Sequence, residues 1–162
     1  RSGRFGAVTN FREIEAPPVA DAPSRGRLVP DYLAGEATPD SYLQQLDGAS
    51  AAFAGFNLLV GDRGSLHFLS NRDSASPRRL APGTYGLSNH ALDTPWPRLL
   101  RARERFDAAL AGDQPAVDEL FELLAEREPA TGAALPGSGL PHDLERAMSA
   151  PFVQNERYGT RW

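Results

Sequence analysis

The sequence predicts an α+β fold built as one domain, and the order of its local patterns is the main reason. Extended, apolar runs typical of strands come first, at residues 3–11, 56–60 and 66–70. Two segments with helical periodicity follow, at 97–111 and 114–127. Since the strands precede these helices, a layered fold of sheet and helices is favoured over a doubly wound parallel sheet. With 162 residues, 41% of them hydrophobic, the chain is long enough to bury one core.

The strand predictions begin with GRFGAVTNF (3–11), whose apolar residues fit an extended segment. FNLLV (56–60) and LHFLS (66–70) are separated by a glycine-containing turn of the length that hairpins use, so they are predicted to pair as antiparallel neighbours. A further short strand is predicted in TYGLSNH, ending near Asn89.

The helix predictions rest on caps and spacing. Thr38 as N-cap, with Pro39 at the first helical position, predicts a helix over 38–47. The helix over 97–111 places Leu99, Ala102, Phe106 and Leu110 on its inner face. For the helix over 114–127, Asp113 is the candidate N-cap, and the apolar residues at helical spacing are Val117, Leu120, Phe121 and Leu124.

Two segments have loop composition, EAPPVADAPSRGR (15–27) and PATGAALPGSGLP (129–141). A short helix is expected after the second, at 142–148, before PFVQNERYGTR returns to an extended pattern. The glycines of PGSGLP do not form a dinucleotide fingerprint, because no strand leads into them and a third glycine is missing.

Composition excludes several function classes. A net charge of −4 and a pI near 5.4 argue against nucleic acid and anionic membranes as partners. The 17 basic residues are all arginine, which excludes Schiff-base chemistry, and the absence of cysteine excludes disulfides, thiolate zinc sites and a thiol nucleophile within the chain. No apolar run approaches the roughly 20 residues of a membrane span. We expect a soluble, cytoplasmic, bacterial protein.

The three histidines predict no metal site, since none has a second ligand type at the spacing of HxxxH or HExxH. His67 fits a tolerated sheet residue. Ser88, His90 and Asp93 are close in sequence, but alternating side-chain directions separate Ser88 from its neighbours and no GxSxG motif is present. A catalytic triad is therefore not predicted.

Two arginine pairs are candidate ligand-binding residues. Arg25 with Arg27, and Arg78 with Arg79, could bind a carboxylate or phosphate through their forked donors. Each pair taken alone also fits solvated surface arginines, which are the commoner case.

Three asparagines are candidates for catalysis: Asn10 in VTNFRE, Asn57 in GFNLLV and Asn89 in GLSNH. An amide N–H at a strand end can stabilise the oxyanion that develops in acyl transfer. The alternative is a turn cap, because asparagine often bonds its own backbone at such junctions. Spacing alone favours the cap.

Several longer segments resemble one known family. VTNFRE (8–13), SRGRLVPDYL (24–33), GFNLLVGD (55–62), LSNR (69–72), PGTYGLSNHALDTPWP (82–97) and RYGTR (157–161) resemble, in this order, the NRDE family, which includes transport and Golgi organisation proteins of animals. The resemblance spans nearly the whole chain.

The resemblance implies an N-terminal-nucleophile-hydrolase-like αββα sandwich, in which an N-terminal cysteine serves as nucleophile and its own α-amino group as base. Asn10 and Asn89 correspond to oxyanion-binding positions, and Arg161 to the arginine beside the nucleophile. Asn57 has no catalytic counterpart and is interpreted as structural.

The chain departs from the family pattern in ways that predict a partial sandwich. Family members start with Met-Cys and carry the Asn-Arg-Asp-Glu motif in an N-terminal segment, so we expect Arg1 to lie downstream of both. The triplet of Asn71, Arg72 and Asp73 is followed by Ser74 and does not correspond to that motif. We therefore expect residues 1–162 to be a single incomplete domain without hydrolase activity of its own.

The resemblance leaves more than one function open. The parent protein is expected to be an amide or ester hydrolase acting on a small acyl substrate. The alternative is a protein that binds and carries haem, an acyl-CoA or another lipid, since the family has been linked to the handling of these ligands and, in animals, to the organisation of the secretory pathway. No cofactor is required by the residues present, although arginines could pair with haem propionates. A housekeeping role of another kind is a third possibility.

Overall fold

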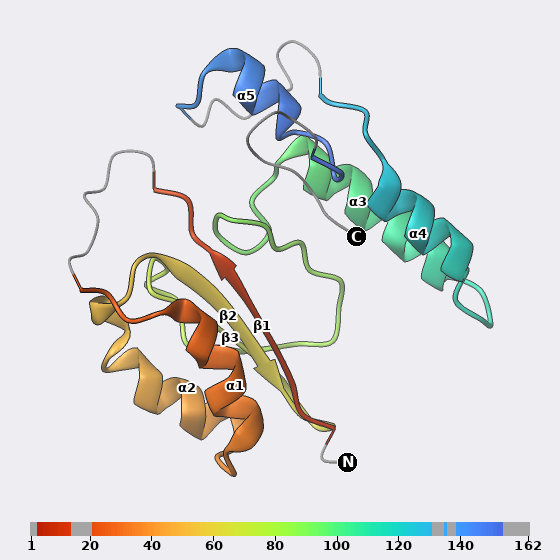
Figure 1. Ribbon diagram of the computed structural model, residues 1–162. Coiled ribbons are helices and arrows are strands. Elements are labelled where there is room, and N and C mark those ends of the chain that lie inside the picture. Colours follow the sequence, from red (N-terminus) through yellow and green to blue (C-terminus); the bar gives the residue numbers. More distant parts are fainter. Residues whose placement is uncertain (1–2, 14–20, 131–134, 136–138, 154–162) are drawn as a thin grey trace. The chain divides into compact units, whose positions relative to one another are not determined.

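The computed structural model describes residues 3–13, 21–130, 135 and 139–153 (Figure 1). Within these ranges the chain forms one antiparallel sheet and five α-helices, which confirms the mixed composition of the predicted fold. The chain divides into two compact units. The sheet unit comprises Arg1–Gly83 and Ser88–Ala91, and the helical unit comprises Thr84–Leu87 and Leu92–Trp162.

The sheet has four strands in the order β1-β2-β3-β4, each antiparallel to its neighbour. The strands are β1 (Phe5–Asn10), β2 (Phe56–Gly61), β3 (Leu66–Ser70) and β4 (Arg78–Leu80). The first strand and the hairpin are confirmed. Strand β4 was not predicted, because three residues with two arginines carry no apolar alternation; it forms by pairing with β3, as in Phe68 opposite Arg78.

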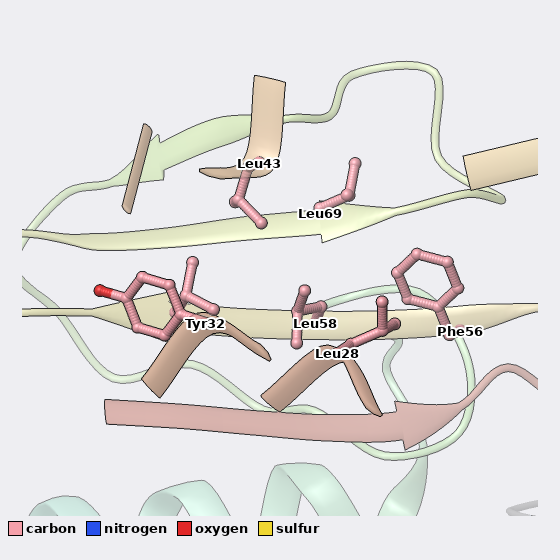
Figure 2. Close-up of a cluster of buried hydrophobic side chains, with 7 residues drawn as sticks. Leu28, Tyr32, Leu43, Phe56, Leu58 and Leu69 are labelled. Carbon is pink, nitrogen blue, oxygen red and sulfur yellow. The ribbon is translucent and has the colours of Figure 1, made fainter. Parts of the chain in front are cut away.

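One face of the sheet is covered by α1 (Leu28–Ala34) and α2 (Pro39–Asp47), which lie side by side in Figure 1. The strand register places Val8, Leu58 and Leu69 in one row on this face. Figure 2 shows the side chains of α1 and α2 lying over these strands. The resulting core consists of Leu28, Tyr32, Leu43, Phe56, Leu58, Val60 and Leu69.

Helix α2 begins as the sequence predicts, with the Thr38 side chain accepting from the Ser41 amide. Helix α1 was not predicted. Its Leu28 and Tyr32 repeat at i and i+4 and its proline falls in the first turn, but seven residues are too few for a clear period.

Tertiary contacts hold α1 in place. The Tyr32 hydroxyl donates to the Gly61 carbonyl at 2.9 Å, and the Arg4 guanidinium lies 3.9 Å from the Tyr32 ring centroid. Burial raises the pKa of Tyr32. A side chain at Gly6 would place its Cβ 3.1 Å from a methyl group of Val29, so a glycine in β1 permits the close approach of this helix.

The second face of the sheet is also apolar. It carries Leu59, Leu66, Phe68 and Leu80, of which Phe68 is fully buried and Leu80 nearly so. A sheet that is apolar on both faces belongs between two layers. The Arg78 guanidinium contributes to this face and lies 5.0 Å from the Phe68 ring centroid.

The helical unit contains α3 (Pro97–Leu110), α4 (Val117–Ala125) and α5 (His142–Ala147). Ion pairs join the first two: Arg105 lies 2.9 Å and Arg101 3.4 Å from the Glu126 carboxylate. The predicted α3 and α5 are confirmed. The prediction of Asp113 as N-cap of α4 is wrong, because the Ala116 amide donates back to Ala109 at the end of α3 and the helix starts only at Val117.

The predicted inner faces of α3 and α4 are not buried among the described residues. Leu123 of α4 and Ala109 of α3 are buried instead. The periodicity showed correctly that these helices are amphipathic, but it does not say which element covers the apolar side. The large side chains left exposed are Leu100, Phe106, Leu110, Val117, Phe121 and Leu124.

The strand predicted in TYGLSNH is also wrong. The Gly86 amide donates to the Asp93 carboxylate at 2.8 Å, and the Gly86 carbonyl accepts from the Asp93 amide at 2.8 Å. These two bonds close a turn. Because both the amide and the carbonyl of Gly86 are bonded to Asp93, they cannot pair with a neighbouring strand. Across the described ranges, none of the helices combines the length and the hydrophobicity that a bilayer span requires.

The core predicts a clear difference between two leucine substitutions. Leu58 is fully buried in β2, so Leu58→Ala should lower the free energy of unfolding by about 2–5 kcal/mol. Leu33 on α1 is 43% exposed, and Leu33→Ala should lower it by less than about 1 kcal/mol. Urea denaturation followed by circular dichroism measures both, and equal effects would contradict the placement of the core.

Candidate functional site

Polar side chains gather at one end of the sheet. Because neighbouring strands are antiparallel, the end of β1, the start of β2 and the end of β3 meet there. We call this region the polar end; it comprises residues 9–13, 54–57, 70–72 and the segment 88–91. All of these residues belong to the sheet unit.

Three hydrogen bonds tie the segment 88–91 to the rest of the polar end. The Thr9 hydroxyl donates to the Ser88 carbonyl at 2.7 Å, and the Arg12 amide donates to the Asn89 carbonyl at 2.7 Å. The Asn57 side-chain amide donates to the His90 carbonyl at 2.9 Å. Three successive carbonyls are therefore each held by a residue of the sheet or of the segment that follows β1.

The two asparagines with a predicted oxyanion role are brought to the same end of the sheet. Asn10 is the last residue of β1 and is exposed, and the residues bonded to the segment 88–91 lie on either side of it in sequence. Asn89 is half-buried, and its Oδ1 accepts from the Ser88 hydroxyl at 3.1 Å. Strand alternation turns the Asn10 side chain to the face opposite that of Thr9.

Asn57 is fully buried in β2. Its Nδ2 donates to the Thr9 hydroxyl at 3.2 Å as well as to the His90 carbonyl, whereas its Oδ1 has no hydrogen-bond partner among the described residues. Two neutral hydrogen bonds contribute roughly 1–3 kcal/mol, and an unpaired buried acceptor costs about as much. Asn57 thus adds little net stability, and its effect is to fix where the segment 88–91 lies.

Gly55 is the backbone junction of the polar end. Its amide donates to the Glu13 carboxylate at 3.2 Å, and its carbonyl accepts from the Phe11 amide at 2.9 Å and from Arg25 at 2.7 Å. A Cβ at Gly55 would lie 2.6 Å from Glu13 Oε2 and 3.0 Å from Phe11 Cβ. A larger residue at this position would therefore displace the Glu13 carboxylate and crowd Phe11.

Glu13 and Arg72 form a two-pronged ion pair beside this junction. Arg72 Nε lies 2.5 Å from Oε1 and Arg72 Nη2 3.2 Å from Oε2 of Glu13; Glu13 is half-buried and Arg72 is exposed. The hydrogen bond from Arg72 is the main reason that the pKa of Glu13 lies below its ordinary value. Planar forks of this kind fix direction as well as distance.

The triplet of Asn71, Arg72 and Asp73 has a structural part to play. The Asn71 amide donates to the Ser50 and Phe53 carbonyls at 3.0 and 3.1 Å, and its Oδ1 accepts from the Phe56 amide at 2.9 Å. Asp73 accepts from the Arg78 guanidinium at 2.8 Å, which lowers the pKa of Asp73.

In neither of the two predicted arginine pairs do both arginines point to the same place. The Arg25 guanidinium reaches the polar end by donating to the Gly55 carbonyl, whereas Arg27 is exposed and pairs with Asp31 at 3.9 Å. Arg78 and Arg79 are successive residues of β4 and leave opposite faces of the sheet. Of the four, the structure therefore places only Arg25 at the polar end. Their ligand-binding role stays a prediction.

Two further candidates from the sequence are Arg161 and His67. Arg161 lies outside the described residues. His67 is buried in β3, with Nδ1 3.7 Å from the Asp40 carboxylate. Over the ranges that the structure describes, no three His, Cys, Asp or Glu side chains are grouped so as to hold a metal ion.

Sequence reasoning missed Glu13, Gly55 and Arg72. Glu13 and Arg72 are 59 positions apart, and no local pattern links them. The available signal was the position of each residue inside a segment quoted above, since VTNFRE ends on Glu13, GFNLLVGD begins on Gly55 and LSNR ends on Arg72.

The lowered pKa of Glu13 predicts how stability depends on pH. A folded-state pKa below the unfolded value means that the ion pair stabilises the fold fully above about pH 4.5 and loses its effect as the pH falls through the folded-state pKa. At pH 7, Glu13→Gln should lower the free energy of unfolding by about 1 kcal/mol, since solvent screens part of this ion pair. The difference from the unsubstituted protein should shrink as the pH falls below 4.5.

Glu36→Gln is the matched control, since Glu36 is exposed between α1 and α2. Urea midpoints between pH 3 and pH 7 give the comparison. A Glu13→Gln effect of constant size over this range would show that the charge of Glu13 does not matter.

Comparison with known proteins gives one consistent result. The family model for Transport and Golgi organisation 2 matches residues 1–162. The chain is 30% identical over 176 residues to the Transport and Golgi organization 2 homolog of Mus musculus, and 34% identical over 178 residues to that of Homo sapiens. Each comparison covers 98% of this chain and 62% of the relative, so the chain spans less than two thirds of the length of these relatives.

The matched region contains the residues that meet at the polar end. Glu13, Gly55 and Arg72 each come from a different segment of the resemblance, and Asn89 from a fourth. The family model accounts for all four segments together. The chain belongs to the Transport and Golgi organisation 2 family, which is the NRDE family.

Proposed function

We propose that the polar end forms part of an acyl-transfer site in an N-terminal-nucleophile-hydrolase-like protein that cleaves a small acyl amide or ester. The observation that carries this proposal is the attachment of the Asn89 segment on both sides of Asn10, through Thr9 and Arg12. Two amide-bearing residues distant in sequence thereby reach one end of one sheet.

The chemistry needs N–H groups that are already aimed at the position of the oxyanion. Asn89 meets part of this requirement, because the hydrogen bond from Ser88 to its Oδ1 fixes how its amide group is turned. Its backbone is held as well, through the bond from the Arg12 amide. The Asn10 side chain lies on the sheet face opposite to that of Thr9. We therefore propose the backbone N–H of Asn10, and not its side chain, as the second contact to the oxyanion.

The αββα sandwich is the fold that we propose for the complete domain. Its support is the sheet with two apolar faces, of which α1 and α2 cover one. Further support comes from the apolar side chains of α3 and α4, such as Phe121, which is 59% exposed. Exposed apolar surface of this kind calls for a further layer.

Ligand binding without turnover is a second proposal, favoured by the word "transport" in the names of the relatives. Arg25 and Arg72 place two guanidinium groups at the polar end. Each has five donors, so one that already binds a carbonyl or a carboxylate can also meet a haem propionate or a phosphate of an acyl-CoA.

Turnover by the full-length protein separates the two proposals. If the site hydrolyses acyl substrates, a panel of acyl amides and thioesters should contain at least one that is cleaved. Asn89→Ala should then lower kcat by about 10²–10³-fold with a smaller change in KM, because the oxyanion contact forms mainly in the transition state.

Gln44→Ala is the control, as Gln44 is an exposed amide on α2. Absence of turnover by the unsubstituted full-length protein would contradict hydrolysis. Saturable binding of haem or of an acyl-CoA in the same preparation would then support carriage, and a weakening of that binding by Arg25→Ala would place the ligand at the polar end.

A further inference from the structure

We propose that Asn57, together with Thr9, is the positioning residue of this site: it sets the place of the Asn89 backbone and thus the aim of the Asn89 amide. For its catalytic meaning the inference rests on the proposed acyl-transfer function. The positioning itself can be measured whether or not the protein turns over a substrate.

The contacts form a continuous chain from the sheet to the segment. Asn57 Nδ2 donates to the Thr9 hydroxyl at 3.2 Å, and that hydroxyl donates to the Ser88 carbonyl at 2.7 Å. The same Nδ2 donates to the His90 carbonyl at 2.9 Å. The peptide carbonyls before and after Asn89 are therefore both held from β1 and β2, by side chains that face each other across the strand pair.

A purely structural role fits Asn57 poorly. The residue is fully buried, and its Oδ1 has no hydrogen-bond partner among the described residues. Leucine has a similar volume and would fill the same space without a buried polar atom. What leucine cannot supply is the pair of N–H donors, and both of these serve the attachment of the segment 88–91, one directly and one through Thr9.

Two neighbouring amides report separately on the segment and on the sheet. The Arg12 amide donates to the Asn89 carbonyl at 2.7 Å, so its hydrogen exchange follows the attachment of the segment. The Phe11 amide donates to the Gly55 carbonyl at 2.9 Å, so its exchange follows the end of the sheet. A loss of general stability would accelerate both.

The experiment is residue-resolved hydrogen exchange by NMR on the full-length protein and its Asn57→Leu variant. We expect exchange of the Arg12 amide to accelerate by about tenfold or more, with a change of less than about threefold at Phe11. Thr9→Val should reproduce this pattern, and Thr9→Ser should restore slow exchange, because serine keeps the hydroxyl. These Thr9 variants also decide the matter if Asn57→Leu does not fold.

Tyr42→Phe is the control, since it also removes one side-chain hydrogen bond, but that bond goes to the Leu28 carbonyl and not to the polar end. It should leave the ratio of Arg12 to Phe11 exchange unchanged. Equal acceleration at Arg12 and Phe11 in Asn57→Leu and Thr9→Val, or no acceleration at either, would overturn the positioning role.

Enzymatic turnover supplies a separate result. If the unsubstituted protein cleaves an acyl substrate, Asn57→Leu should lower kcat by about tenfold or more with little change in KM. Selective release of the Arg12 amide in a protein that cleaves nothing would support the positioning role and contradict the acyl-transfer function.

Discussion

The arrangement of the polar end depends on one backbone position, Gly55, where a side chain could fit only if Glu13 moved out of its present place. Its amide and carbonyl connect the start of β2 to Glu13, Phe11 and Arg25, and the Glu13 carboxylate is in turn fixed by Arg72. A Cβ at Gly55 would lie 2.6 Å from Glu13 Oε2, so the ion pair between Glu13 and Arg72 and the start of β2 can pack this closely only with a glycine at this position. Four of the segments that carry the family resemblance thereby meet at one end of the sheet.

The candidate site follows from this arrangement. Once the ends of β1 and β2 are fixed, Thr9 and Asn57 lie next to each other, and their polar atoms can hold the segment that carries Asn89. The unpaired oxygen of Asn57 lowers the stability of the fold, and buried polar atoms of this kind are retained mainly where they serve a function. The core beneath α1 and α2 thus stabilises the sheet unit, whereas the side chains of the polar end determine where the segment with Asn89 lies.

Local signals in the sequence sufficed for β1, for the strands of the hairpin and for α2 and α3, because alternation, an N-cap and helical spacing act over a few residues. They failed where distant residues decide. Strand β4 exists only through pairing with β3, α4 starts late because Ala116 bonds back to α3, and Gly86 turns toward Asp93 instead of extending. For the site, the resemblance named Asn10 and Asn89, but Glu13, Gly55 and Arg72 needed three-dimensional neighbours to be recognised.

The most direct test of the central claim is the structure of the full-length protein with a phosphonate analogue of the tetrahedral intermediate. If the polar end presents Asn89 to an oxyanion, its Nδ2 should lie about 2.7–3.1 Å from a phosphonyl oxygen, with the hydrogen bonds from Asn57 and Thr9 intact. An analogue bound away from residues 88–90 would contradict the account.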